Sequence, residues 1–170
     1  MNSKATAFII AALSSTAVSA QSSHHRAVQF GDEVVTLKFS NIPSRFGELQ
    51  QLWDATNEAT SPVEQERLLR IRWEDYGDTI ALQSLANYHL ERGDLVQAYA
   101  HFYAVHKIAQ WYESVVPESH KPGPVLRKIH SNIAADVERI GKELSPSQRK
   151  TGVKLAAALI RNNPNCCTGI

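Results

Sequence analysis

The sequence predicts an all-α fold of about six antiparallel helices, preceded by a short N-terminal β-hairpin. Between residues 44 and 162, apolar residues recur at helical spacing, and prolines, glycines and capping residues divide the stretch into helix-sized segments. Strict alternation of apolar and polar residues, which is typical of strands, is confined to residues 28–39. The proline-rich segment 116–124 predicts a loop that is long for a helix–helix connection.

The first twenty residues have the layout of a secretory signal peptide. Lys4 supplies a positive charge, residues 7–13 form an apolar run too short to span a bilayer, and residues 18–20 (Val-Ser-Ala) suit signal cleavage. Cleavage after Ala20 would leave a chain of 150 residues, enough for one domain with a sizeable core. We therefore expect an exported protein, periplasmic or secreted, with no membrane insertion after signal cleavage.

Charge and cysteine content narrow the function classes. Removal of the signal peptide would leave 17 Lys and Arg against 17 Asp and Glu, a net charge near zero. Nucleic-acid binding draws on a basic field, so we expect no nucleic-acid partner. The two cysteines, Cys166 and Cys167, are adjacent, and three states stay open for them in an oxidising compartment: free thiols, a bond between neighbours, or cross-links to another chain.

Residues 28–39 predict a β-hairpin around Gly31-Asp32. An isolated hairpin is only marginally stable in water, so we expect it to lie against the helices. The apolar positions of its two strands are Val28, Phe30, Val35, Leu37 and Phe39.

Helix boundaries follow from capping signals. Ser61-Pro62 and Ser145-Pro146 each place a serine N-cap before a proline in the first helical position, and Glu64 and Gln148 stand where a capping box requires them. The expected helices span residues 44–60, 61–77, 78–93, 94–115, 125–144 and 145–162, the third and fourth capped by Asp78 and Asp94. The predicted organisation is a signal peptide (1–20), an N-terminal extension with the hairpin (21–43), a helical repeat-like domain (44–162) and a C-terminal tail (163–170).

Apolar stripes on these helices predict their buried faces. The first stripe is Phe46, Leu49, Leu52 and Trp53. The strongest stripe belongs to the fifth helix and is Val125, Leu126, Ile129, Ile133, Val137, Ile140 and Leu144. The three tryptophans, Trp53, Trp73 and Trp111, lie at core spacing and favour packing over a ligand site.

Residues 81–106 form the most distinctive segment, a predicted pair of short helices broken at Gly93-Asp94. Ala86 and Ala98 are small where the two backbones would cross, and large apolar residues flank them. Such a pair packs closely but cannot bury both faces alone, which is the physical logic of helical solenoids. With Phe102 one turn further along, this pattern resembles the tetratricopeptide repeat.

The Sel-like branch of that superfamily is the narrower resemblance. It rests on Ala98-Tyr99, Phe102-Tyr103 and Ala109, and on residues 144–160, which open Leu-Ser-Pro-Ser-Gln and continue into an alanine- and leucine-rich run. His89 stands where the family has an aromatic residue, and the usual double glycine is reduced to one. An ordinary six-helix bundle is the alternative arrangement.

The resemblance implies a binding scaffold in which the first helix of each pair lines a groove for a partner. The outward positions that it marks as partner-binding are Ile80, Gln83, Asn87, Leu90 and Glu91. Asn87 carries most weight, because an asparagine at the matching place in many such repeats hydrogen-bonds the partner's backbone. The competing interpretation is that these residues are simply solvated.

No motif of the sequence predicts a catalytic residue, a cofactor or a metal site. His101 and His106 lie five residues apart on one helix, whereas metal-binding pairs on helices lie about three or four apart. Glu74-Asp75 is an adjacent carboxylate pair, and adjacent helical residues do not face each other. A basic patch at Arg67, Arg70 and Arg72 should be largely neutralised by Glu64, Glu66 and Glu74.

The sequence thus favours an exported adaptor that binds a protein or peptide partner through a helical-repeat groove, as envelope assembly factors and immunity-type inhibitors do. The alternative is a small exported hydrolase whose catalytic carboxylates or histidines converge from separate helices. A homo-oligomer whose groove is filled by a second copy of the chain is a third interpretation.

Overall fold

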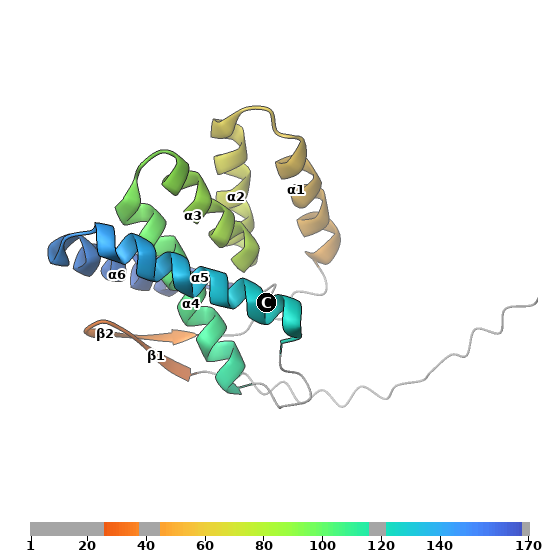
Figure 1. The fold of residues 1–170 in the computed structure, drawn as a ribbon. Helices are drawn as coiled ribbons and strands as arrows, with labels where there is room; N and C mark the ends of the chain where they lie inside the picture. The colour runs from red at the N-terminus through yellow and green to blue at the C-terminus, as the bar shows by residue number, and fades with distance from the viewer. Residues whose placement is uncertain (1–25, 38–44, 116–121, 168–170) are drawn as a thin grey trace, which may run out of the picture.

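The computed structural model describes residues 26–37, 45–115 and 122–167 (Figure 1). These residues form two strands and six helices, which confirms an all-α fold with a short hairpin. The elements are β1 (Arg26–Phe30), β2 (Glu33–Leu37), α1 (Phe46–Glu58), α2 (Pro62–Tyr76), α3 (Thr79–Glu91), α4 (Leu95–Val115), α5 (Pro124–Glu143) and α6 (Pro146–Arg161). The expected signal peptide and Phe39 lie outside the described residues. Within those residues, no helix has the length and apolar character needed to cross a membrane.

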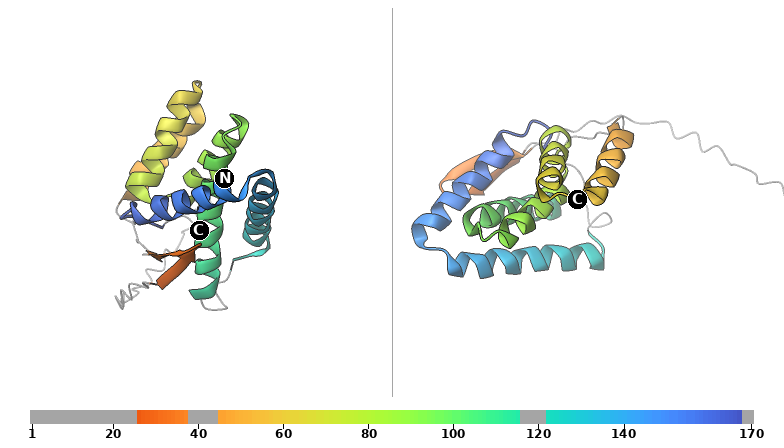
Figure 2. Two further views of the ribbon diagram at one scale, coloured as in Figure 1. Left: turned by 90° about the vertical axis from the view of Figure 1, so that its left-hand side faces the viewer. Right: turned by 90° about the horizontal axis from the view of Figure 1, so that it is seen from above.

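Helix α4 lies at the centre of the molecule, and α3, α5 and α6 all pack against it. From α1 to α5, each helix packs against the next helix in the chain. Helix α6 departs from this series, because it packs against α4 and both strands of the hairpin. Figure 2 shows α5 and α6 diverging in a V from the turn that joins them.

Tyr99 of α4 lies between the two arms of this V. Its ring contacts Gly141 of α5 and Gly152 of α6. A Cβ atom would come within 3.2 Å of the ring at Gly141 and within 2.6 Å of it at Gly152. The two glycines therefore leave the space that the buried tyrosine ring occupies between the helices.

The hairpin lies against the helices, as expected. Its strands pair antiparallel, with Val28 opposite Val35, and the two-residue turn has Gly31 in the left-handed region at φ 57°. Phe30 is buried, and its ring meets that of Tyr103 of α4 edge-on at a centroid distance of 6.0 Å. The hairpin thus covers part of the core between α4 and α6.

A buried ion pair joins α1, α2 and α3. Asp78 caps α3, as predicted, by accepting hydrogen bonds from the backbone N–H groups of Ile80 (2.9 Å) and Ala81 (3.4 Å). Its other carboxylate oxygen accepts from Arg72 Nε and Nη2 at 2.9 and 2.8 Å and from the indole N–H of Trp53 at 2.9 Å. Arg72 and Asp78 are only 4% and 1% exposed, so each charge depends on the other for compensation. Arg72 therefore does not belong to an exposed basic patch.

Residues 162–167 pack back onto the end of α2. Asn163 donates a hydrogen bond to the carbonyl oxygen of Trp73 at 2.6 Å, and Asn165 donates one to that of Glu74 at 3.3 Å. Gly77, which ends α2 in the left-handed conformation at φ 65°, allows this approach. A Cβ atom there would come within 2.0 Å of the Asn165 carbonyl oxygen. The segment after α6 is thereby docked on the α2–α3 junction.

The two cysteines form a disulfide bond with each other. This is one of the three states that the sequence left open. Cys166 and Cys167 are 2% and 0% exposed and belong to the main hydrophobic cluster, so they lie in the core and not on a solvated tail.

The two predicted capping boxes have different outcomes. At α6, Ser145 Oγ accepts from the backbone N–H of Gln148 at 3.3 Å and the Gln148 side chain accepts from the Ser145 N–H at 2.9 Å, which confirms the box. At α2, Ser61 makes no side-chain capping bond, so that prediction is wrong. The Glu64 carboxylate there pairs with Arg67 one turn later, at 2.7 Å, and does not accept from the Ser61 N–H.

Candidate partner-binding site

The five residues predicted to bind a partner lie along α3 in three different environments. Ile80 and Gln83 line a groove between α3 and α5, with α4 as its floor. Asn87 and Glu91 are exposed farther along the helix and are not part of this lining. Leu90 is half-buried and packs against the core. The structure thus brings two of the five residues to a hollow, and Asn87 is not one of them.

We call this hollow the α3–α5 groove; it has a volume of about 180 Å³. Ile80 and Ile129 are 40% and 38% exposed and stand on walls contributed by different helices. Small-molecule sites usually enclose about 300 Å³ or more, so the groove suits one or two apolar side chains of a larger partner. Its lining residues are Thr79, Ile80, Gln83, Val105, Ile108, Ala109, Leu126, Ile129, His130 and Ile133.

The groove exists because the apolar stripe of α5 is longer than its buried part. Ile133 and Ile140 are buried, as predicted, but Val125 near the start of the helix is 76% exposed. The prediction that the whole stripe faces the core is therefore wrong at its N-terminal end. Phe46 at the start of α1 is another such case, since it is 67% exposed. Residue spacing shows which side of a helix is apolar but not how far the neighbouring helix extends along it.

The beginning of α5 brings partial positive charge to the groove. Arg127 and Lys128 are exposed, but neither is part of the lining, and Lys128 lies on the opposite face of the helix. His130 Nδ1 lies 2.7 Å from the Glu113 carboxylate, which ties the groove wall to α4. The N-terminal end of α5 adds partial positive charge, and its first turn contains no acidic residue. A partner with carboxylates flanking an apolar side chain would fit this rim.

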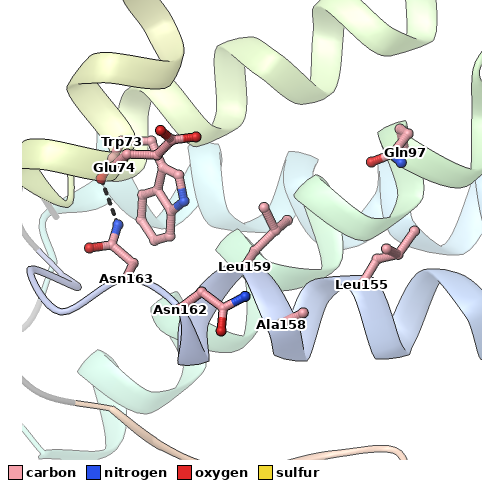
Figure 3. A pocket seen from close by; sticks show the side chains of 8 residues that line it. All are labelled: Trp73, Glu74, Gln97, Leu155, Ala158, Leu159, Asn162 and Asn163. Atoms are coloured by element: carbon pink, nitrogen blue, oxygen red, sulfur yellow. Dashed lines mark hydrogen bonds between the residues drawn. The ribbon is translucent and has the colours of Figure 1, made fainter.

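A second hollow, the α2–α6 pocket, lies between the end of α2, the start of α4 and α6 (Figure 3). Its volume is about 360 Å³, within the usual range of small-ligand sites. Apolar side chains form the floor, and Glu74, Gln97 and Asn162 stand around it. The lining residues are Trp73, Glu74, Gln97, Leu155, Ala158, Leu159, Asn162 and Asn163. The sequence did not indicate this pocket, because its members come from three distant segments.

Two histidines are buried between α3 and α4. The ring centroids of His89 and His101 are 4.9 Å apart, and His101 Nδ1 lies 2.8 Å from the carbonyl oxygen of Gln97, to which it donates. Burial lowers the pKa of His101 to about 4, and burial also lowers the pKa of His89. Neither Nε2 atom has a hydrogen-bond partner among the described residues. Both rings are therefore neutral at pH 7.

No candidate metal centre is found in the part of the chain that the structure describes, where no three His, Cys, Asp or Glu side chains are grouped to hold an ion. Comparison with protein families, curated proteins and solved structures finds no match to this chain.

Proposed function

We propose that this chain is an exported adaptor that binds a protein or peptide partner in the α3–α5 groove. The observation that carries the proposal is an apolar recess flanked by partly exposed Ile80 and Ile129, with Val125 on the same face of α5 one turn before Ile129. Exposed apolar residues that gather at a hollow, and are not scattered singly, mark interaction sites.

The proposal includes a tetratricopeptide-like arrangement of the helices. Its support is that α1 to α5 pack in chain order and that α3, the first helix of the distinctive pair, contributes to a groove wall. The resemblance implies that role for the first helix of each pair. In this arrangement α6 ends the array by packing across α4 and the hairpin.

The lining specifies the chemistry of the partner. Full burial of an aliphatic side chain such as Ile129 contributes about 1.5–3 kcal/mol, so an apolar anchor in the recess would supply most of the affinity. Gln83 is placed to hydrogen-bond the partner's backbone at the wall. The N-terminal end of α5 favours acidic flanking residues, and this contribution should weaken as salt increases.

A pull-down with the mature chain from envelope or culture extract tests the proposal. The wild type should retain a stoichiometric partner, and Ile129→Glu should lose it because a carboxylate would enter the apolar recess. Ser131→Glu is the matched control, since Ser131 is exposed on the same helix and lies outside the groove lining. Retention by both variants, or loss by both, would contradict the site.

Two further variants separate the groove from the rest of α3. Gln83→Ala should weaken retention, whereas Asn87→Ala should leave it unchanged because Asn87 lies outside the lining. The reverse result would place the partner-binding site around Asn87 and not in the groove. N-terminal sequencing of the native protein tests export, which predicts Gln21 as the first residue.

A further inference from the structure

The α2–α6 pocket combines an apolar floor with a single formal charge. Trp73, Leu155 and Leu159 supply much of the floor, and Glu74 is the one charged residue of its lining. Figure 3 shows Glu74 and Gln97 on opposite sides of this floor, with Leu159 between them. The pocket shares no lining residue with the α3–α5 groove.

The Glu74 carboxylate is free to meet a ligand. It is exposed and forms neither an ion pair nor a hydrogen bond with any residue in the described ranges. The guanidinium groups of its own helix are engaged elsewhere: Arg72 with buried Asp78, Arg70 with Glu66 and Arg67 with Glu64. The basic patch is thus neutralised by Glu64 and Glu66, as predicted, but Glu74 takes no part because Arg72 pairs with Asp78.

Helix ends of both signs meet at the pocket. Helices α2 and α6 end beside it, at Tyr76 and Arg161, with partial negative charge, and the partly positive beginning of α4 next to Gln97 is capped by the Asp94 carboxylate. Among the lining residues, Gln97 and Asn162 add amide oxygens that accept hydrogen bonds. The unpaired Glu74 carboxylate therefore favours a cation over an anion at this site, and the floor requires that the cation carry an apolar stem.

The pocket wall is held in place without a ligand. Asn163, itself a lining residue, donates to the carbonyl oxygen of Trp73 at 2.6 Å, and its side-chain oxygen accepts from the N–H of Asn165 at 2.8 Å. Asn165 in turn donates to the carbonyl oxygen of Glu74 at 3.3 Å. A wall fixed in this way loses little conformational freedom on binding.

We propose that the α2–α6 pocket binds a primary alkylammonium group, with the ammonium beside Glu74 and the alkyl stem along Leu159 and Leu155. An ammonium presents three N–H donors and tolerates a single carboxylate, whereas a guanidinium is matched by two parallel acceptors. A lysine side chain of a peptide and a free alkylamine share this chemistry. Gln97, across the floor, is placed to hydrogen-bond the peptide group that only the lysine source carries.

Nuclear magnetic resonance titration of the mature chain tests the site with four probes. They are n-hexylammonium, n-hexanol, n-hexanoate and Nα-acetyl-lysine methylamide. Both cationic probes should shift the indole resonance of Trp73 and the side-chain amides of Gln97 and Asn162, and hexanoate should not. Tighter binding of the lysine derivative identifies a peptide source, and tighter binding of hexylammonium identifies a free amine; either result supports the site.

The deciding variants are a neighbouring pair of carboxylates. Glu74→Gln should lower the affinity for both cationic probes by about fivefold or more and remove the salt dependence of their binding. Asp75→Asn, an exposed neighbour outside the lining, should leave affinity within about twofold. Ala158→Phe should abolish binding by filling the floor while leaving the circular-dichroism spectrum unchanged. Equal binding of hexanol, hexanoate and hexylammonium, or an unchanged affinity in Glu74→Gln, would overturn the proposal.

Discussion

The α3–α5 groove and the α2–α6 pocket are two hollows of one helical scaffold with opposite electrostatic character. The groove is apolar and lies beside the partly positive N-terminal end of α5, whereas the pocket has one free carboxylate and two amides around an apolar floor. The groove forms where α5 begins with its apolar stripe uncovered, and the pocket forms where α2 and α6 end. Both binding features therefore lie at helix ends, where no neighbouring helix covers the apolar surface.

Removal of the buried carboxylate of Asp78 should have the largest effect, because both hollows depend on it. Asp78 caps α3, which lines the groove, and holds Arg72 of α2, which leads into the pocket. Asp78→Ala leaves a guanidinium buried and unpaired, so we expect a loss of about 3–5 kcal/mol in the free energy of unfolding. Urea denaturation measures this loss.

Asp75→Ala, an exposed control three residues earlier, should change stability by less than about 0.5 kcal/mol. Binding of groove and pocket probes should fall together in Asp78→Ala. If one hollow kept full affinity in Asp78→Ala, the structure of that hollow would not depend on Asp78.

Acid should destabilise the α3–α4 pair that forms one side of the groove. His101 has its pKa lowered by burial from 6.5 to about 4. As pH falls below about 6.5, the unfolded chain takes up this proton before the folded chain does, so stability that is complete at higher pH is lost progressively down to pH 4. The shift corresponds to about 3 kcal/mol.

Urea unfolding between pH 7 and pH 4 measures this loss in the wild type and in His101→Phe. The variant should lose less stability over that range, because the titrating ring is gone. Parallel pH profiles for the two proteins would show that His101 does not carry the effect.

Gly77 and Gly93 form a matched pair that tests the C-terminal segment packed beside the pocket. Both have positive φ, 65° and 76°, so alanine is strained at either position. A Cβ atom at Gly93 meets nothing within 4 Å, but at Gly77 it meets the Asn165 carbonyl oxygen at 2.0 Å. Gly93→Ala should cost about 1 kcal/mol, and Gly77→Ala about 1–3 kcal/mol more because the C-terminal segment must move.

The readout that distinguishes the hollows is probe affinity. Gly77→Ala should weaken alkylammonium binding, since Asn165 holds the wall beside Glu74, and should leave partner retention by the groove intact. Equal stability of the two variants would mean that the docked segment contributes nothing.

Much of the scaffold was predictable because its signals are local. The hairpin, the caps at Asp78 and Asp94 and the six helices follow from residue types a few positions apart, and the structure places them as expected. Of the five residues that the tetratricopeptide-like resemblance marked, Ile80 and Gln83 line the groove.

The sites could not be predicted to the same degree, because they depend on where elements end relative to one another. Val125 and Ile133 belong to one stripe with uniform spacing, yet one is exposed and the other buried. The pocket joins Trp73, Gln97 and Asn163, which no local pattern relates. Only tertiary packing determines both outcomes.

The smallest predicted effect concerns the N-terminal caps of α2 and α6, the two helices whose C-terminal ends border the pocket. Ser61 and Ser145 have the same sequence context, a proline at the next position and Glu or Gln two places after that proline. Ser145 makes both bonds of a capping box, whereas Ser61 makes no side-chain capping bond. Ser145→Ala should therefore cost about 1 kcal/mol and Ser61→Ala close to nothing, as measured by urea denaturation. Equal losses would mean that Ser61 also caps its helix in solution, with Glu64 leaving Arg67 to complete the box.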